Sequence, residues 1–252
     1  MTIALIQMDI TWADPDANRA RAEAAIRSLP ADVDLIVLPE MFSTGFATQP
    51  EDIAEAEPSA TLAWMRAMAS QRGSAVAGSV AVSDATISYH NRFFFVKPDG
   101  TVAYYDKHHL FTYGGEQQSY TAGNERCIVE WRGVRFLLLV CYDLRFPVWS
   151  RNREDYDCAL YVANWPTTRI DAWTALLRAR AIENQCYVVG VNRVGSDPAC
   201  QYCGASLAID PYGHNLAACT TNAEDSTTAE LDMDALRAFR QKFPVLKDRD
   251  RE

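Results

Sequence analysis

Three reactive side chains each come directly after an apolar, strand-like stretch of the chain. They are Glu40 after residues 35–39, Lys107 after residues 102–106 and Cys141 after residues 136–140. Because ligand crevices in α/β proteins open at the carboxyl ends of strands, side chains in such places can converge although they lie far apart in sequence. A thiol, a carboxylate and an ammonium supply a nucleophile, a proton carrier and a donor to an oxyanion. The pattern therefore predicts a hydrolase that forms a covalent intermediate on a cysteine.

Cys141 is the candidate nucleophile of this set. It ends an apolar run, and Pro147 shortly after it suits the first turn of a helix. A sharp turn from strand to helix would expose the sulfur, and a helix N-terminus with a nearby cation would favour the thiolate. Read by itself, Cys141 is more typical of an inert core thiol, since free cysteine is among the most buried residue types.

Glu40 and Lys107 have the chemistry that such a thiol needs. A carboxylate at position 40 can take the thiol proton, return a proton to the leaving amine and later activate water. Lys107 and the backbone N–H of Tyr142 can donate to the oxygen that becomes negative in a tetrahedral intermediate. The alternatives, residue by residue, are a solvated carboxylate at a strand end and an exposed surface lysine.

The elements that must position these residues alternate between strand-like and helix-like patterns. The predicted strands are residues 2–8, 33–38, 74–82, 92–96, 102–105, 126–131, 134–140, 159–163, 187–192 and 205–210. The predicted helices are residues 15–29, 59–72, a short one near 147, 171–184 and 232–241. Residues 107–125 have no clean period and are expected to form an irregular loop. With no repeat or linker, we expect one α/β domain over residues 1–252.

Composition narrows the classes of function. The formal net charge of -9 argues against a protein that neutralises nucleic-acid phosphates. The first residues contain neither a basic leader nor a membrane span, which predicts a cytoplasmic protein with no membrane partner. Seven widely scattered cysteines, an odd number, predict reduced thiols instead of a disulfide framework.

Longer motifs around the three residues resemble those of a known family. They are Leu38-Pro39-Glu40-Met41-Phe42, Tyr105-Asp106-Lys107-His108-His109-Leu110-Phe111, Val140-Cys141-Tyr142-Asp143-Leu144-Arg145-Phe146-Pro147, and further similarity at 163–166, 178–185 and 192–193. In this order they resemble the Glu, Lys and Cys signatures of the nitrilase superfamily, and within it those of bacterial omega-amidases. The resemblance covers nearly the whole chain.

This resemblance implies a four-layer α-β-β-α sandwich that assembles at least as a homodimer through its helical face. It implies that Cys141 attacks an amide carbon, Glu40 handles the proton and Lys107 steadies the oxyanion. Ammonia then leaves and water hydrolyses the thioester, with no metal or organic cofactor. Glu116 falls where many members carry a second active-site glutamate that holds the lysine.

Omega-amidases remove the terminal amide of 2-oxoglutaramate and 2-oxosuccinamate, which carry a carboxylate at the other end. Arg145 is the candidate partner of that carboxylate, because a guanidinium can bind it in a bidentate fashion. The alternative for Arg145 is a structural ion pair. The aromatic residues expected to wall the pocket and exclude water are Phe42, Phe46, Tyr142 and Trp165.

Other readings remain open at this point. The same residues could hydrolyse an N-carbamoyl amino acid or a nitrile. A Cys-His hydrolase would need one of His90, His108, His109 and His214 as its base. The pair Cys200 and Cys203 has the C-x-x-C spacing of zinc or redox sites. A binding scaffold without catalysis, which holds a partner through the helical face, is the reading from another class.

Overall fold

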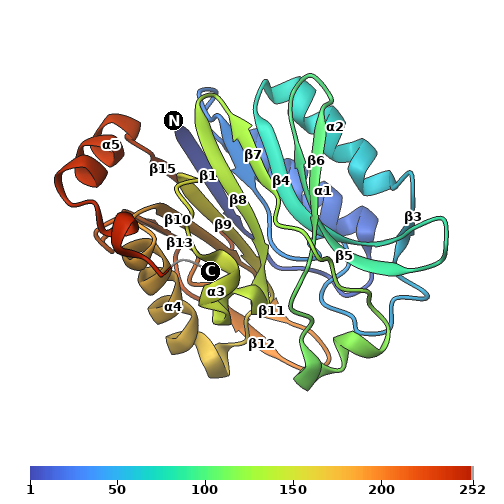
Figure 1. Ribbon diagram of the computed structural model, residues 1–252. Coiled ribbons are helices and arrows are strands. Elements are labelled where there is room, and N and C mark those ends of the chain that lie inside the picture. The colour runs from blue at the N-terminus through green and yellow to red at the C-terminus, as the bar shows by residue number, and fades with distance from the viewer. Residues whose placement is uncertain (251–252) are drawn as a thin grey trace.

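The computed structural model describes residues 1–250, which form two β-sheets packed face to face (Figure 1). The first sheet contains β1 (Thr2–Gln7), β2 (Leu35–Val37), β3 (Glu55–Ala56), β4 (Ala75–Ser83), β5 (Tyr89–Val96), β6 (Val102–Asp106) and β15 (Asp225–Glu230). Its order is β15-β1-β2-β4-β5-β6, and β3 pairs with β4. The second sheet contains β7 (Ile128–Trp131), β8 (Val134–Val140), β9 (Cys158–Ala163), β10 (Tyr187–Asn192), β13 (Leu207–Ile209) and β14 (Asn215–Ala218), in the order β14-β13-β10-β9-β8-β7.

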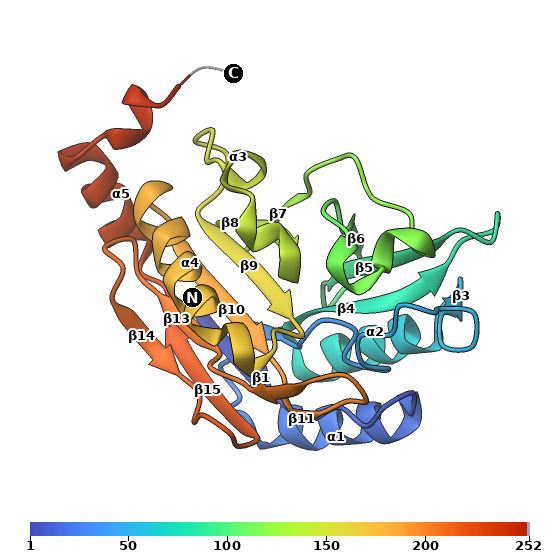
Figure 2. The ribbon, with the colours of Figure 1, turned by 90° about the horizontal axis from the view of Figure 1, so that it is seen from below.

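Helices cover the outer face of each sheet. The helices α1 (Pro15–Ser28) and α2 (Ala60–Arg72) lie on the first sheet, and α4 (Ile170–Glu183) and α5 (Met233–Lys242) lie beside the second (Figure 2). The short α3 (Pro147–Ser150) follows β8. The order of layers is therefore α-β-β-α, which confirms the predicted four-layer sandwich. Among residues 1–250, no helix combines the length and the apolar character that crossing a bilayer requires.

The main core lies between the two sheets, where the strands are buried on both faces. Leu137, Leu138 and Leu139 of β8 are all fully buried, although successive side chains point to opposite faces. Such continuous apolar runs are typical of parallel strands covered on both sides, and β8 is parallel to β9. Gly190 of β10 allows α4 to approach closely, since a Cβ there would lie 2.5 Å from Leu177 Cδ1.

The helix starts predicted from the sequence agree with the structure. Asp14 accepts a hydrogen bond from the backbone N–H of Ala17 at 3.0 Å, and the Ser59 hydroxyl accepts one from Leu62 at 3.0 Å, so both act as N-caps. The strands β5 and β6 pair in antiparallel register around the turn at residues 98–100. The irregular loop after Lys107 contains only two 3-10 turns, η1 (Thr112–Gly114) and η2 (Glu116–Gln118).

The connection after β8 agrees with the expectation, whereas a hairpin near residue 200 was not predicted. The chain leaves β8 through a 3-10 helix, η3 (Cys141–Arg145), and the short α3 begins at Pro147, where a helix was predicted. Residues 194–203, which lie outside every predicted strand, form a hairpin of β11 (Val194–Ser196) and β12 (Gln201–Cys203). These strands are short and polar, so their sequence has no clear period. The Asp197 side chain stabilises the turn between them by accepting hydrogen bonds from the N–H groups of Ala199 and Cys200.

Candidate active site

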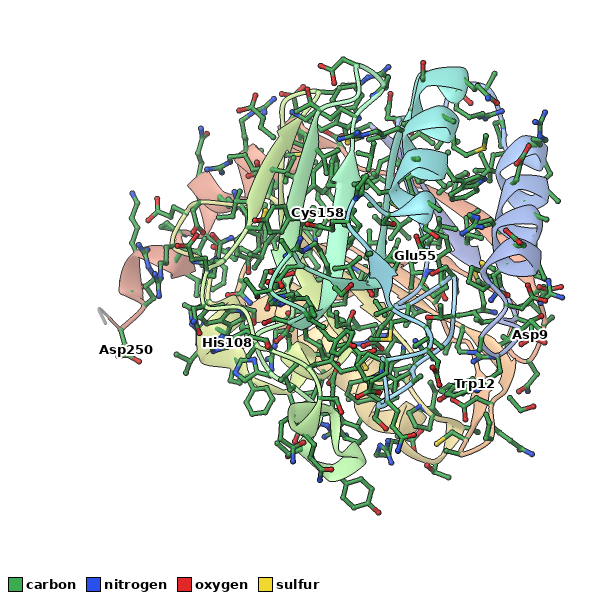
Figure 3. The ribbon with its side chains drawn as sticks, turned by 90° about the vertical axis from the view of Figure 1, so that its right-hand side faces the viewer. Asp9, Trp12, Glu55, His108, Cys158 and Asp250 are labelled. Atoms are coloured by element: carbon green, nitrogen blue, oxygen red, sulfur yellow. The ribbon has the colours of Figure 1, made fainter. Side chains whose placement is uncertain are left out.

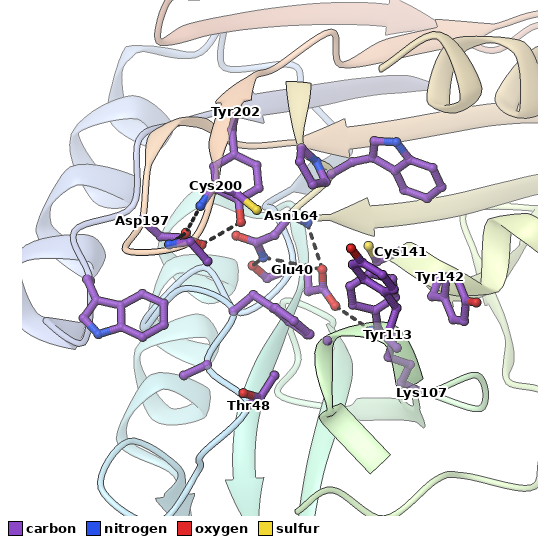
Figure 4. Close-up of a pocket in the computed structure, with 18 of the residues that line it drawn as sticks. Glu40, Thr48, Lys107, Tyr113, Cys141, Tyr142, Asn164, Asp197, Cys200 and Tyr202 are labelled. Carbon is purple, nitrogen blue, oxygen red and sulfur yellow. Dashed lines mark hydrogen bonds and ion pairs between the residues drawn. The ribbon is translucent and has the colours of Figure 1, made fainter. Parts of the chain in front are cut away.

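A cavity of about 760 Å³ opens at the end of the sandwich where several strands terminate. Figure 3 places Trp12, which lines this cavity, and His108 on the same lower end of the molecule. Glu40 follows β2, Lys107 follows β6 and Cys141 follows β8, and all three line the cavity. The structure thus brings together the three residues singled out by their places at strand ends (Figure 4).

Glu40 and Lys107 form a buried ion pair. Lys107 Nζ lies 3.0 Å from Glu40 Oε1, and both side chains are shielded from solvent. Glu116 completes the cluster, because Lys107 Nζ also donates to its two carboxylate oxygens at 3.1 and 2.9 Å. The backbone N–H of Phe111 donates to Glu116 Oε2 at 2.6 Å, which holds this carboxylate in the irregular loop. The predicted place of Glu116 beside the lysine is therefore observed.

Two asparagines that sequence reasoning did not select also bind Glu40. Asn91 Nδ2 donates to Glu40 Oε1 at 2.8 Å, and the backbone N–H of Asn164 donates to Glu40 Oε2 at 2.8 Å. Asn164 follows β9, so the strand-end rule that selected Glu40 could have found it. Asn91 lies within β5, and no local signal distinguishes it from other strand residues. Together the asparagines hold the carboxylate in one orientation beside the sulfur.

Cys141 stands at a strained turn. Its φ of 44° is positive, a conformation that costs free energy for a residue with a side chain and that recurs at active sites. The buried carboxylate of Asp143 holds this turn, because its Oδ2 accepts from the N–H of Val140 at 2.9 Å and from the Tyr105 hydroxyl at 2.8 Å. Its Oδ1 accepts from the N–H of His109 at 3.0 Å. Asp143 thereby links the segment of Cys141 to the segment of Lys107.

The charges of the cluster set its protonation. Burial, and then the Glu40 carboxylate, raise the pKa of Cys141 well above its usual value, although Lys107 opposes this. This direction is opposite to the expected stabilisation of a thiolate by a helix N-terminus. Burial also raises the pKa of Glu116. Burial alone would lower the pKa of Lys107, but Glu116 and Glu40 outweigh it, so this pKa is raised and the lysine stays an ammonium.

The wall of the cavity is aromatic, with one correction to the predicted set. Phe46, Tyr142 and Trp165 line the cavity as expected. Phe42 does not, because it is fully buried in the core beneath the first sheet, 5.8 Å from the ring of Trp64. The prediction that Phe42 contacts substrate is therefore wrong. The chain reverses direction just after Glu40, so Phe42 faces α2 while Phe46 faces the cavity.

Arg145 lies in the cavity wall with its Cζ 4.9 Å from the centre of the Trp165 ring. Among residues 1–250, no carboxylate lies within 4.0 Å of its guanidinium. The alternative of a structural ion pair for Arg145 is thus not observed. Its guanidinium is available to an acidic ligand.

The rival readings find less support in the described part of the chain. None of the four histidines lines the cavity, and His109 Nδ1 instead donates to the Asp143 carboxylate at 2.8 Å. Cys200 lies at the cavity and Cys203 is buried, both as free thiols. Residues 1–250 contain no group of three or more His, Cys, Asp or Glu side chains placed to hold a metal ion.

The four-layer fold and the Glu-Lys-Cys cluster define a class of hydrolases that act on carbon–nitrogen bonds other than peptide bonds. The chain belongs to the carbon-nitrogen hydrolase family, whose sequence profile matches residues 2–241. A CN-hydrolase superfamily protein from Xanthomonas campestris, solved with an arsenic adduct in its active site, is 42% identical. Its TM-score is 0.97, with 100% of this chain and 98% of that chain covered.

Curated relatives are similar over their full length. The omega-amidase YafV of Escherichia coli (strain K12) is 50% identical, over 99% of this chain and 97% of the relative. The 2-oxoglutaramate amidase of Bacillus subtilis is 36% identical, over 98% of this chain and 96% of the relative. These similarities extend across both sheets and all the strand ends that form the cavity.

Proposed function

We propose that this protein is an omega-amidase that hydrolyses the terminal amide of 2-oxoglutaramate and 2-oxosuccinamate to the acid and ammonia. The observation that carries the proposal is the cluster of Glu40, Lys107 and Cys141 at one cavity, with the Glu40–Lys107 contact at 3.0 Å. The names of the relatives described above support the choice of substrate. The reaction is hydrolysis, and the described residues supply each proton transfer that it needs.

The first half of the reaction forms a thioester. Cys141 Sγ attacks the amide carbon while Glu40 accepts the thiol proton, which is needed because the raised pKa keeps the resting sulfur protonated. Lys107 Nζ and the backbone N–H of Tyr142 stabilise the oxyanion, and such donors are worth about 3–4 kcal/mol in a transition state. Glu40 then gives the proton to the leaving nitrogen, the carbon–nitrogen bond breaks and ammonia departs.

The second half reverses the same proton path. Glu40 accepts a proton from a water molecule as its oxygen attacks the thioester carbon. The tetrahedral intermediate collapses, the carbon–sulfur bond breaks and the thiolate of Cys141 takes the proton back from Glu40. Glu116 holds the Lys107 ammonium in place throughout, because Lys107 Nζ donates to both carboxylate oxygens of Glu116.

The cavity wall provides for the rest of the substrate. The guanidinium of Arg145 has no acidic partner among residues 1–250 and can bind the distal carboxylate. Tyr142 and Trp165 line the same cavity and restrict the access of water to the thioester. No metal or organic cofactor takes part in this scheme.

The test is ammonia release from a panel of substrates. Purified protein is assayed with 2-oxoglutaramate, glutamine, N-carbamoyl-β-alanine and a simple nitrile, with Cys141→Ala as the inactive control. We expect 2-oxoglutaramate to have the highest kcat/KM. A preference for the carbamoyl compound or the nitrile would refute the substrate assignment. Equal inactivity of wild type and Cys141→Ala would favour a binding scaffold.

We propose further that residues 1–252 form a single carbon-nitrogen hydrolase domain in a cytoplasmic homodimer. Exposed apolar side chains on the helical layer of the second sheet support the dimer, among them Ile182 of α4 and Phe243 after α5. Light scattering of the purified protein tests this, with a dimer mass expected. A monomer at micromolar concentration would contradict it.

A further inference from the structure

We propose that Arg169 is a second carboxylate-binding residue, which acts with Arg145 to select amides that carry an acidic end over neutral amides. This inference rests on the proposed omega-amidase function and adds a specificity residue to it. Arg169 was not selected from the sequence, because it lies 28 residues beyond Cys141 in a short turn with no motif of its own.

Arg169 is one of three basic residues that line the cavity, together with Lys107 and Arg145. Lys107 is neutralised by Glu40 and Glu116 at 3.0 and 2.9 Å. Neither arginine has an ion-pair partner among residues 1–250. In a protein with 33 acidic and 24 basic residues, two unpaired guanidinium groups at one cavity indicate an anionic ligand.

The position of Arg169 is set by contacts on both sides of the cavity. It ends the 3-10 turn η4 (Thr167–Arg169), and its carbonyl oxygen accepts a hydrogen bond from Trp165 Nε1 at 2.8 Å. Its Cζ lies 5.5 Å from the centre of the Phe111 ring, across from η4. Trp165 therefore contacts both arginines, since its ring lies against the Arg145 guanidinium and its N–H donates to the Arg169 backbone.

The contact with the Phe111 ring connects Arg169 to the cluster of Glu40, Lys107 and Glu116. The backbone N–H of Phe111 binds Glu116 at 2.6 Å, so the ring under Arg169 belongs to the segment that holds Lys107. A guanidinium that rests on a ring face keeps its N–H groups available at its edges, where they can bind a carboxylate in a bidentate fashion. A substrate carboxylate bound to this guanidinium would fix the far end of the substrate while its amide lies at Cys141.

The acidic residues of the cavity do not compete for this guanidinium. Asp197 accepts hydrogen bonds from the N–H groups of Ala199 and Cys200 and from the Tyr202 hydroxyl at 2.6 Å. Asp52 also lines the cavity but forms no ion pair with Arg169 within 4.0 Å. These carboxylates repel an anion from their side, so the positive potential for the substrate comes from the side of Arg145 and Arg169.

The experiment compares Arg169→Gln and Arg169→Lys on matched substrates. The substrates are 2-oxoglutaramate, glutaramate and pentanamide, which has the same chain length as glutaramate but no carboxylate. Arg66→Gln is the control, since Arg66 is exposed on α2, does not line the cavity and undergoes the same loss of charge. Thermal unfolding of each variant checks the fold, which we expect to be unchanged.

We expect Arg169→Gln to raise KM for both acids roughly 10- to 100-fold with little change in kcat, as fits the loss of a charge-assisted hydrogen bond. Its kcat/KM for pentanamide should stay within about twofold, because that substrate has no group to lose the contact. Arg169→Lys should recover part of the loss, and Arg66→Gln should match wild type. Equal losses on all three substrates, or none, would overturn the inference.

Product inhibition provides a second readout that does not depend on turnover of the neutral amide. Glutarate should inhibit Arg169→Gln with an inhibition constant raised by a factor similar to that in KM. An unchanged constant for glutarate would refute the role of Arg169. Failure of the proposed function would appear differently, as absence of ammonia release from 2-oxoglutaramate in the wild type.

Discussion

Replacement of Asp143 by asparagine tests how the turn at Cys141 is held. The two carboxylate oxygens accept from the N–H groups of Val140 and His109, on opposite sides, at 2.9 and 3.0 Å. An asparagine has only one acceptor oxygen, so its NH₂ group must face one of these two buried N–H groups whichever way the amide turns. The Tyr105 hydroxyl, which donates to Asp143 at 2.8 Å, is affected as well.

The magnitude follows from the number of contacts. The loss of one charge-assisted hydrogen bond costs about 1.5–3 kcal/mol, and a buried donor left without an acceptor costs about 1–3 kcal/mol. Asp143→Asn should therefore lower the free energy of unfolding by roughly 3–5 kcal/mol. For a chain of this size each kcal/mol shifts the Tm by about 2–4 °C. A displaced sulfur should also reduce kcat/KM by roughly 10- to 100-fold.

Chemical denaturation and ammonia release measure the two effects. Asp99→Asn is the matched control, since Asp99 is exposed in the turn between β5 and β6 and accepts from the N–H of Thr101 at 2.9 Å, which asparagine can also do. It should have the stability and activity of wild type. If Asp143→Asn unfolded within about 0.5 kcal/mol of wild type and kept full activity, the account of the turn would be refuted.

Two further predictions concern the charges of the cluster. Lys107→Met leaves the Glu40 and Glu116 carboxylates buried without a cation, so it should destabilise the fold by about 3–5 kcal/mol and abolish turnover. Adding Glu116→Gln to this variant should restore much of the stability but none of the activity. Recovery of turnover in the double variant would contradict the role of Lys107. Because the pKa of Cys141 is raised, the thiolate fraction at neutral pH is small. The variant Glu40→Gln removes the proton acceptor, while burial still raises the pKa of Cys141. In this variant, alkylation of Cys141 by iodoacetamide should become about tenfold faster per pH unit from pH 6 to 8. Mass spectrometry locates the adduct, and a rate independent of pH over this range would show that the pKa of Cys141 is low.

The sequence by itself determined the parts of this protein that depend on neighbouring residues. The helix that begins at Pro15 and the two strands on either side of residues 98–100 depend on local patterns, and the sequence predicted them. The rule that polar residues after strands face a common crevice also selected Glu40, Lys107 and Cys141, and β2, β6 and β8 do end at one cavity, although β8 belongs to the other sheet.

Only the tertiary structure decided which side chains face the cavity and what charges surround them. Phe42 and Phe46 are alike in sequence, but one lies in the core and the other at the cavity, because the chain turns between them. Asn91 binds Glu40 across 51 residues of chain. The raised pKa of Cys141 results from burial and from the Glu40 carboxylate. Burial and charge at a site are sums over residues distant in sequence, so no local pattern contains them.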